Sequence, residues 1–209
     1  MARKLRLIGK SGKMGAALQR LIAQSKLYVL DDLAPDAIID FSHPSRLDET
    51  ISLKKPAIIG TTGYSEKELQ KMQAASEYMP ILYSANFSMG IAALKKMARM
   101  AAALLEGCDI DIIEVHHTQK KDLPSGTALA LAASLQAPPK IHSIRSKGII
   151  GRHTIFLNTG KEELELTHRA MERDVFAIGA LKTVEFICKK KSGLYSLEDF
   201  VEETLLCNR

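Results

Sequence analysis

The sequence predicts an α/β fold, in which a doubly wound parallel sheet is followed by an α+β domain with a mixed sheet. The first half alternates short apolar runs with amphipathic helical patterns, and this order favours parallel strands joined by helices. After residue 87 the pattern changes, and the strands expected at 153–157 and 163–168 follow each other with no helix between them, which indicates antiparallel pairing. The 209 residues, 46% hydrophobic and 25% charged, suffice for one or two domains with cores of their own.

In the first half, short apolar runs predict strands at 5–8, 37–40, 56–60 and 81–83. The helix after the first strand carries apolar residues from Met14 onward at spacings of three to four. Two further helices are expected near Ser45 and Ser65, because each serine stands three residues before an acidic residue, as in a capping box.

In the second half, the pattern predicts a long helix over 88–106, which is rich in alanine and methionine. Further elements are expected as a strand at 110–115, a loop and helix over 124–135, strands at 140–145, 153–157 and 163–168, a helix over 174–190, and a short capped helix from Ser196. We therefore expect a dinucleotide-binding domain at 1–87 and a substrate-binding and tetramerisation domain at 88–191. Residues 192–209 are interpreted as a segment that packs back on the first domain.

Composition narrows the classes of function. No apolar run approaches the roughly 20 residues that cross a bilayer, and the first residues lack the apolar stretch of a secretory signal, so no membrane contact is expected. Three cysteines without CxxC spacing argue against disulfides and structural zinc, and favour a reducing, cytoplasmic setting. The net charge of +5 permits nucleic acid, but scattered lysines and 5% aromatic residues disfavour it. A small anionic substrate explains the charge equally well.

A glycine-rich turn follows the first predicted strand and opens the first helix, in the order Gly9-Lys10-Ser11-Gly12-Lys13-Met14-Gly15. This placement is typical of a Rossmann-like nucleotide-binding sheet, although the spacing GxxGxxG also occurs in an ordinary βα turn. The segments Gly60-Thr61-Thr62-Gly63 and Ser84-Ala85-Asn86-Phe87 end two other strands. Because ligands bind beyond the carboxyl ends of parallel strands, the three turns together favour a nucleotide cleft.

The segment from Glu114 to Thr127 has the highest concentration of functional side chains in the chain. It contains two adjacent histidines, lysines and a Ser-Gly-Thr turn at a helix start. A histidine there suits proton donation, a lysine suits a carboxylate, and the backbone N–H groups of the turn suit a second anion. The alternative is a histidine that serves packing alone. No metal is expected, because no further ligand stands at metal-binding spacing.

The motif Glu114-Val-His-His-x-x-Lys-x-Asp-x-Pro-Ser-Gly-Thr-Ala128 resembles the signature of the dihydrodipicolinate reductase family. The resemblance runs through almost the whole chain. It includes the glycine turn at 9–15, Ile39-Asp-Phe-Ser42, Gly60-Thr-Thr-Gly63, Ala85-Asn-Phe-Ser88, Ile144-Arg145, Gly151-x-His153-Thr154, Glu165-x-Thr-His-Arg169 and Phe176-Ala-Ile-Gly-Ala180.

The resemblance implies a reductase of lysine and diaminopimelate synthesis that uses NADH or NADPH on a cyclic dicarboxylate, 4-hydroxy-tetrahydrodipicolinate. It implies hydride transfer to the substrate ring with loss of water, and protonation of the resulting enamine by His116, with Lys120 as the second catalytic residue. Substrate contacts fall on His117, Gly126 and Thr127. Cofactor contacts fall on Gly9, Lys10, Ser11, Gly12, Lys13, Met14, Gly60, Thr61, Thr62, Ser84, Ala85, Asn86 and Phe87.

The chain departs from the family after the first helix, where the usual second strand with its ribose-binding end is shortened to 27–32, so the sequence leaves the preference between NADH and NADPH open. Asp31 and Asp32 are the two candidates for the ribose contact. The family forms a homotetramer through the second-domain sheet. Apolar residues on both faces of the strand around Phe156 favour the same assembly here, with a monomer as the alternative.

Two other functions remain open on the sequence. One is a reductase of another small cyclic or carboxylic acid, and the other is a catalytically inactive nucleotide-binding or assembly protein of the same fold. The block from His116 to Thr127 argues against the first, and retention of both His116 and Lys120 argues against the second.

Overall fold

The computed structural model describes residues 2–135 and 137–207, which form two compact units. Unit 1 contains the residues up to Phe87 together with those from Asp174 onward, and unit 2 contains Ser88–Arg173. The first division coincides with the expected boundary at residue 87. The second falls at 173 and not at 191, because the helical segment 174–188 packs with the first unit.

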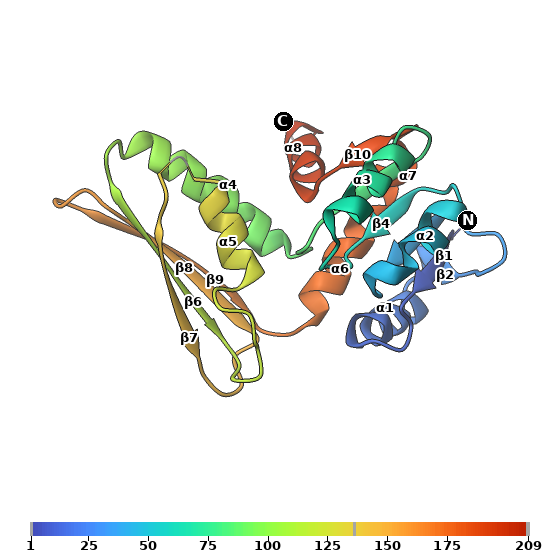
Figure 1. Ribbon diagram of the computed structural model, residues 1–209, viewed down its shortest axis with the longest axis horizontal. Coiled ribbons are helices and arrows are strands. Elements are labelled where there is room, and N and C mark those ends of the chain that lie inside the picture. The colour runs from blue at the N-terminus through green and yellow to red at the C-terminus, as the bar shows by residue number, and fades with distance from the viewer. Residues whose placement is uncertain (1, 136, 208–209) are drawn as a thin grey trace. The chain divides into compact units, whose positions relative to one another are not determined.

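Unit 1 is built on a six-stranded sheet in the order β10-β5-β4-β3-β1-β2, with every pair parallel (Figure 1). Its strands are β1 (Arg3–Ile8), β2 (Tyr28–Leu30), β3 (Ala37–Asp40), β4 (Ala57–Ile59), β5 (Pro80–Tyr83) and β10 (Gly193–Tyr195). Strands β3 and β4 are buried at every residue, which is why they read as short unbroken apolar runs. The expected doubly wound parallel sheet is confirmed.

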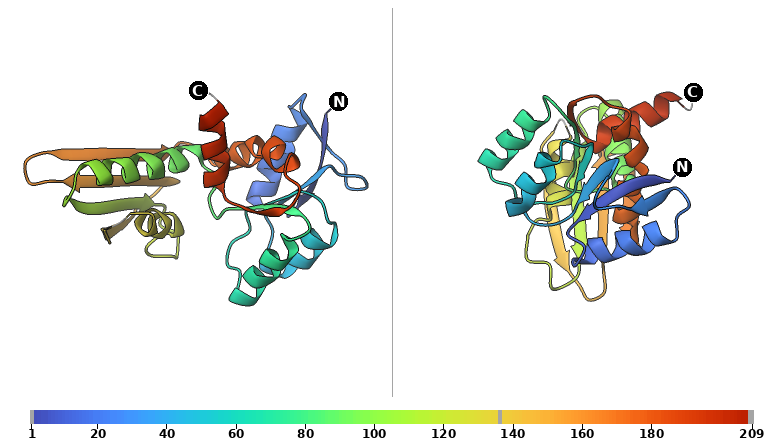
Figure 2. Two further views of the ribbon diagram at one scale, coloured as in Figure 1. Left: turned by 90° about the horizontal axis from the view of Figure 1, so that it is seen from above. Right: turned by 90° about the vertical axis from the view of Figure 1, so that its right-hand side faces the viewer.

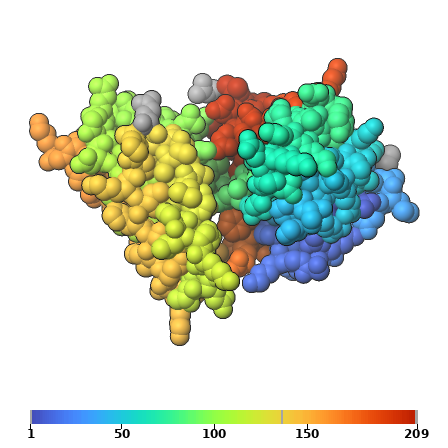
Figure 3. Space-filling view, in the orientation of Figure 1, coloured from blue at the N-terminus to red at the C-terminus, as the bar shows by residue number. Residues whose placement is uncertain are grey.

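Helices cover both faces of this sheet, as the right-hand view of Figure 2 shows for α1 on one side and α2 and α3 on the other. The helical segments are α1 (Lys13–Ala23), η1 (Pro44–Arg46), α2 (Leu47–Ser52), α3 (Glu66–Ala75), α6 (Asp174–Lys182), α7 (Val184–Cys188) and α8 (Leu197–Cys207). Leu47 of α2 and Met72 of α3 pack on Ile8, Ile38 and Ile59. Helices α2 and α3 form part of the surface of unit 1 in Figure 3.

Unit 2 is a four-stranded mixed sheet in the order β7-β6-β8-β9, with α4 and α5 on one face. Strand β6 pairs parallel with β7 and antiparallel with β8, and β8 pairs antiparallel with β9. The elements are α4 (Met89–Leu104), β6 (Asp109–His116), α5 (Gly126–Ala133), β7 (Lys140–Arg145), β8 (Gly151–Asn158) and β9 (Glu163–Ala170). The mixed sheet confirms the α+β expectation for this part of the chain.

Local chemistry explains where the elements differ from expectation. Ser45 does not begin a helix with a capping box, because Pro44 starts a 3₁₀ turn in which the ring of His43 accepts the Ser45 N–H at 3.3 Å. The expected box at Ser65 does form with Glu68. The single helix expected over 174–190 is divided at Thr183, whose hydroxyl donates to the Ala180 carbonyl at 2.8 Å.

The return of the 174–188 segment to unit 1 is fixed by three kinds of contact. Arg20 of α1 pairs with Asp174 at 2.6 Å, and the Tyr28 hydroxyl donates to the carbonyl of Leu181 at 3.0 Å. Val184 and Ile187 are fully buried. Strand β10, which the sequence analysis missed, then pairs with β5 and extends the parallel sheet.

No described helix is long and apolar enough to cross a membrane. The cysteines at 108, 188 and 207 are free thiols.

Candidate active site

The glycine turn after β1 admits no side chains at two of its positions. Gly9 has φ of +91°, and a Cβ there would lie 2.3 Å from the carbonyl oxygen of Phe41. A Cβ on Gly15 would lie 2.1 Å from the carbonyl oxygen of Gly9. Gly12 is the N-cap of α1, so the turn presents a bare helix amino terminus. A dinucleotide pyrophosphate requires this arrangement, and the turn therefore fits the expected cofactor.

Two other turns end neighbouring strands at the same edge of the sheet, because all its strands are parallel. Gly60 follows β4, and a Cβ there would lie 2.1 Å from the ring of Phe41. The segment Ser84–Phe87 follows β5, where the Ser84 hydroxyl donates to the Asn86 carbonyl at 2.8 Å. The rings of Phe41 and Phe87 meet edge to face at 5.5 Å. The three turns thus stand at one sheet edge, as the sequence predicted.

Buried Asp40, at the end of β3, holds the turn after β4 in place. Its carboxylate accepts hydrogen bonds from the hydroxyls of Ser42, Thr50 and Thr61 at 2.5, 2.6 and 3.0 Å. The Ser42 N–H adds another at 3.0 Å. Because Thr61 belongs to the turn after β4, this carboxylate fixes that turn of the candidate cofactor site relative to the segment after β3 that contains Ser42.

The two ribose candidates after β2 have different surroundings. Asp31 pairs with Lys4 at 2.9 Å and accepts the N–H groups of Leu33 and Ala34, so it holds its own turn. Asp32 instead pairs with Lys10 of the glycine turn at 2.5 Å. Asp32 is therefore the candidate that lies beside a predicted cofactor residue.

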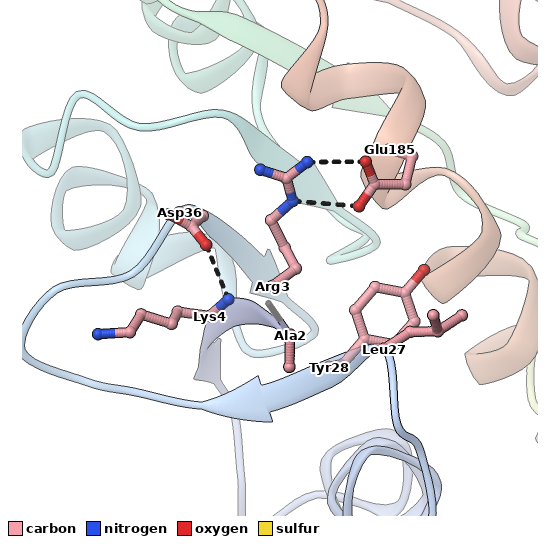
Figure 4. Close-up of a pocket in the computed structure, with 7 residues that line it drawn as sticks. All are labelled: Ala2, Arg3, Lys4, Leu27, Tyr28, Asp36 and Glu185. Carbon is pink, nitrogen blue, oxygen red and sulfur yellow. Dashed lines mark hydrogen bonds and ion pairs between the residues drawn. The ribbon is translucent and has the colours of Figure 1, made fainter.

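A hollow of about 500 Å³ lies at the opposite edge of this sheet, where the strands begin (Figure 4). Its charged groups are already paired, since Arg3 donates twice to Glu185 at 2.7 and 3.1 Å, and Asp36 accepts the backbone N–H of Lys4 at 2.9 Å. The hollow therefore offers a ligand fewer unpaired polar groups than the glycine-rich edge does.

In unit 2, Glu114 and His116 stand two residues apart on β6 and so share the face of the sheet that α4 and α5 cover. Glu114 is fully buried, and its Oε2 contacts Nδ1 of His116. Its Oε1 accepts from Nη2 of Arg145 at 2.8 Å and from the Ser125 N–H at 3.2 Å. Burial would raise the pKa of Glu114, but the hydrogen bonds from Arg145, above all, and from His116 outweigh it and lower the pKa to about 2.

An ionised carboxylate only accepts hydrogen bonds, so the Nδ1 of His116 carries the hydrogen. The other ring nitrogen, Nε2, then remains for proton exchange. Burial lowers the pKa of His116 and exceeds the opposite influence of Glu114. The ring meets that of His153 edge to face at 5.1 Å, and burial lowers the pKa of His153 to about 3, so that this neighbour stays neutral.

Lys120 lies in the turn that follows β6, four residues after His116. Its Nζ pairs with Asp122 at 2.8 Å while its side chain remains partly exposed. Arg145 donates to the carbonyls of Lys120 and Asp122 at 3.3 and 2.5 Å and so attaches this turn to β7. The same guanidinium thus holds both the Lys120 turn and the Glu114 carboxylate.

The turn ends at α5, whose N-cap is Ser125. The Ser125 hydroxyl accepts the Ala128 N–H at 3.2 Å and lies 3.3 Å from Nε2 of His153. The predicted anion-binding residues Gly126 and Thr127 form the first turn of this helix, where backbone N–H groups favour an anion. His116, Lys120 and the start of α5 therefore all lie near the carboxyl end of β6 in unit 2.

His117 does not share the surroundings of His116. Its Nδ1 is buried without a hydrogen-bond partner among the described residues, and its Nε2 lies 3.3 Å from Nη2 of Arg173. Sequence reasoning gave no role to Glu114, Arg145 and His153 beside His116, although its motifs contained them, and it missed Arg173 beside His117. Strand geometry gave a signal only for Glu114, because a residue two positions before His116 on a strand must face the same way. No group of metal-ligating side chains occurs among residues 2–135 and 137–207.

Comparison with known proteins identifies the family to which the chain belongs. The profile described as "Dihydrodipicolinate reductase, C-terminus" matches residues 90–201, and that described as "Dihydrodipicolinate reductase, N-terminus" matches residues 28–87. The chain belongs to the dihydrodipicolinate reductase family. The family's carboxy-terminal profile contains the residues around both His116 and His117, from Glu114 to Arg173.

Curated relatives in this family match nearly end to end. The 4-hydroxy-tetrahydrodipicolinate reductase of Thermosipho africanus is 36% identical, over 96% of this chain and 98% of its own. The enzyme of the same name from Campylobacter jejuni strain 81-176 is also 36% identical, over 95% and 98%. A solved dipicolinate-bound dihydrodipicolinate reductase from Paenisporosarcina sp. TG-14 has a TM-score of 0.81, covers 95% of this chain and 99% of its own, and at 23% identity supports the fold.

Proposed function

We propose that this protein reduces 4-hydroxy-tetrahydrodipicolinate, also called dihydrodipicolinate, to tetrahydrodipicolinate with NADH or NADPH, in lysine and diaminopimelate biosynthesis. Membership of the reductase family along nearly the full chain supports this activity. The observation that carries the assignment of chemistry is the cluster at the end of β6, where a buried carboxylate–histidine pair adjoins Lys120 and the start of α5.

The cofactor is assigned to unit 1, which we propose as the dinucleotide-binding domain. The residues that would hold it are Gly9, Lys10, Ser11, Gly12, Lys13, Met14, Gly60, Thr61, Thr62, Ser84, Ala85, Asn86 and Phe87. When bound, NADH or NADPH supplies a hydride to the substrate ring. The chain's own contribution is a rigid set of turns, in which Gly9 and Gly15 permit close approach of the backbone and Asp40 fixes the loop of Thr61.

Unit 2 is the proposed substrate domain, and its charges suit a cyclic dicarboxylate. Lys120 and the N–H groups of Gly126 and Thr127 are the proposed partners of one carboxylate. For the other, the guanidinium of Arg173, whose Nη2 lies 3.3 Å from Nε2 of His117, supplies positive charge beside His117. Two anion-binding groups on one unit match the two carboxylates of the substrate.

His116 is the proposed proton donor. Without substrate its pKa is lowered by burial, so the ring is largely neutral near pH 7. A dianionic substrate beside the ring would raise this pKa and favour the imidazolium. Substrate binding would therefore favour protonation of His116 at Nε2, and this is the proton that His116 delivers.

The remaining assignments concern assembly and location. We propose a homotetramer formed through the sheet of unit 2, because Ile155 and Leu157 are fully buried under its helices while half-buried Phe156 faces the other way. We also propose a cytoplasmic location, which the free thiols of Cys108, Cys188 and Cys207 favour.

The test of the activity is a spectrophotometric assay of NADH and NADPH oxidation, with substrate formed in situ from pyruvate and aspartate semialdehyde. We expect oxidation that depends on both precursors. Cofactor binding without turnover would reject the proposed activity and favour an inactive nucleotide-binding protein. Turnover only with other small acids would favour the alternative reductase.

A further inference from the structure

Glu114 is the buried acceptor at the centre of the His116 cluster. It is fully buried, and its partners come from three places: His116 on its own strand β6, Arg145 at the end of β7, and the Ser125 N–H ahead of α5. A buried carboxylate is costly unless such partners compensate it. This set therefore indicates a charge that is kept at this position for a purpose besides packing.

The first consequence concerns the orientation of His116. Because Glu114 accepts the hydrogen of Nδ1, the ring is held in one tautomer and one direction. The Nε2 atom forms no hydrogen bond within the described part of the chain. It faces Gly151, where an added Cβ would lie 3.1 Å away, so the glycine leaves space beside the nitrogen that must reach substrate.

The second consequence concerns Lys120. Arg145 donates to Glu114 and also to the carbonyls of Lys120 and Asp122. The ion pair of Glu114 and Arg145 therefore links the strand that carries the histidine to the turn that carries the lysine. Loss of either member would disturb both groups.

We propose that Glu114, anchored by Arg145, is a positioning residue that fixes the tautomer of His116 and so directs proton transfer through Nε2. This inference rests on the proposed function. In the step itself, the Nε2–H bond of the imidazolium breaks as a C–H bond forms on the substrate enamine carbon. The neutral ring keeps the hydrogen on Nδ1, which stays hydrogen-bonded to Glu114. A proton from solvent then protonates Nε2 again.

Several charged or titratable groups face His116. Glu114 on β6 favours its protonated form, whereas Lys120 in the following turn and Arg145 on β7 disfavour it. His153 on β8 faces the ring as a neutral neighbour. Removing the carboxylate while the cations remain must lower the pKa of His116. The basic limb of the pH profile for kcat/KM, which reports loss of the donor proton, then moves to lower pH.

The test is Glu114→Gln, which keeps the shape of the side chain but removes its charge. Its amide can either accept from or donate to Nδ1, so the tautomer of His116 is no longer fixed. We expect kcat/KM at neutral pH to fall about tenfold to a hundredfold, because a displaced donor transfers protons poorly. We also expect the basic limb to move to lower pH. In nitrogen-15 NMR, with His116 assigned from the His116→Gln spectrum, the Nδ1–H tautomer should give way to a mixture.

Asp111→Asn is the matched control, because Asp111 contacts Nε2 of His142 at 2.6 Å and also lies on β6, outside the cluster. It should leave turnover and the His116 spectrum unchanged. If Glu114→Gln fails to fold, Glu114→Gln with Arg145→Met removes both charges and is measured in its place. A folded variant of either kind with the wild-type pH profile and tautomer would overturn the proposal. Wild-type protein without turnover would reject the proposed function instead, and the NMR result would still decide the role of Glu114.

Discussion

Replacing Gly15 with alanine should weaken cofactor binding through a steric effect that can be followed atom by atom. Gly15 lies in the first turn of α1, and its added Cβ would stand 2.1 Å from the Gly9 carbonyl oxygen and 2.8 Å from two backbone atoms of Lys10. Ordinary contact begins near 3.4 Å. Because all these neighbours are backbone, the glycine turn itself must retreat by about 1 Å or more.

A shift of this size exceeds the tolerance of a hydrogen bond, whose usual donor–acceptor distance is about 2.9 Å. A hydrogen bond from a backbone N–H to a charged phosphate contributes about 1.5–3 kcal/mol. With tenfold in Kd for each 1.4 kcal/mol or so, losing one such bond weakens binding about tenfold to a hundredfold.

Fluorescence titration with NADH and NADPH measures this effect on Gly15→Ala. Ala16→Ser is the control, because it also adds one heavy atom in the same helical turn, at an exposed position. The control should bind as the wild type does. Wild-type Kd in a folded Gly15→Ala variant would show that this turn does not hold the cofactor.

Three further predictions follow from the charges and surfaces of unit 2. Lys120→Met should raise KM strongly, and more so at low ionic strength, whereas exposed Lys121→Met should not; an equal effect would contradict the assignment. The pKa of His153 falls from 6.5 unfolded to about 3 folded, so stability declines as pH drops through this window. Between about pH 7 and 4.5, urea unfolding should show the wild type losing about 3 kcal/mol more than His153→Asn, and equal losses would refute it. Light scattering at micromolar concentration should give a tetramer that Phe156→Asp dissociates, and a mass near 23.0 kDa, unchanged on dilution, would exclude it.

The parallel sheet was predictable because its strands are buried on both faces and therefore appear as apolar runs that end in glycine or polar turns. Strand β10 was missed for the opposite reason. It has three residues, none of them fully buried, and only its pairing with β5 makes it a strand. The return of 174–188 to unit 1 likewise depends on contacts such as that of Tyr28 with Leu181, which span most of the chain.

At the candidate site, the sequence placed His116, Lys120 and the start of α5 close together because they are close along the chain. It included Arg145 in a motif of the resemblance but gave it no role in the site, because this residue stands 31 positions after Glu114. These two residues meet only because β6 and β7 are parallel neighbours with His116 opposite Arg145 in the register. His153 enters through the antiparallel register in which it stands opposite Glu114.

The measurement that tests the central claim most directly is the steady-state kinetics of His116→Gln beside its cofactor affinity. If His116 delivers the proton, kcat should fall by about a hundredfold or more, while the Kd for NADH or NADPH barely changes. A histidine that serves only packing would instead lower the stability and leave turnover per folded molecule intact. Near-normal kcat in a well-folded variant would contradict the account.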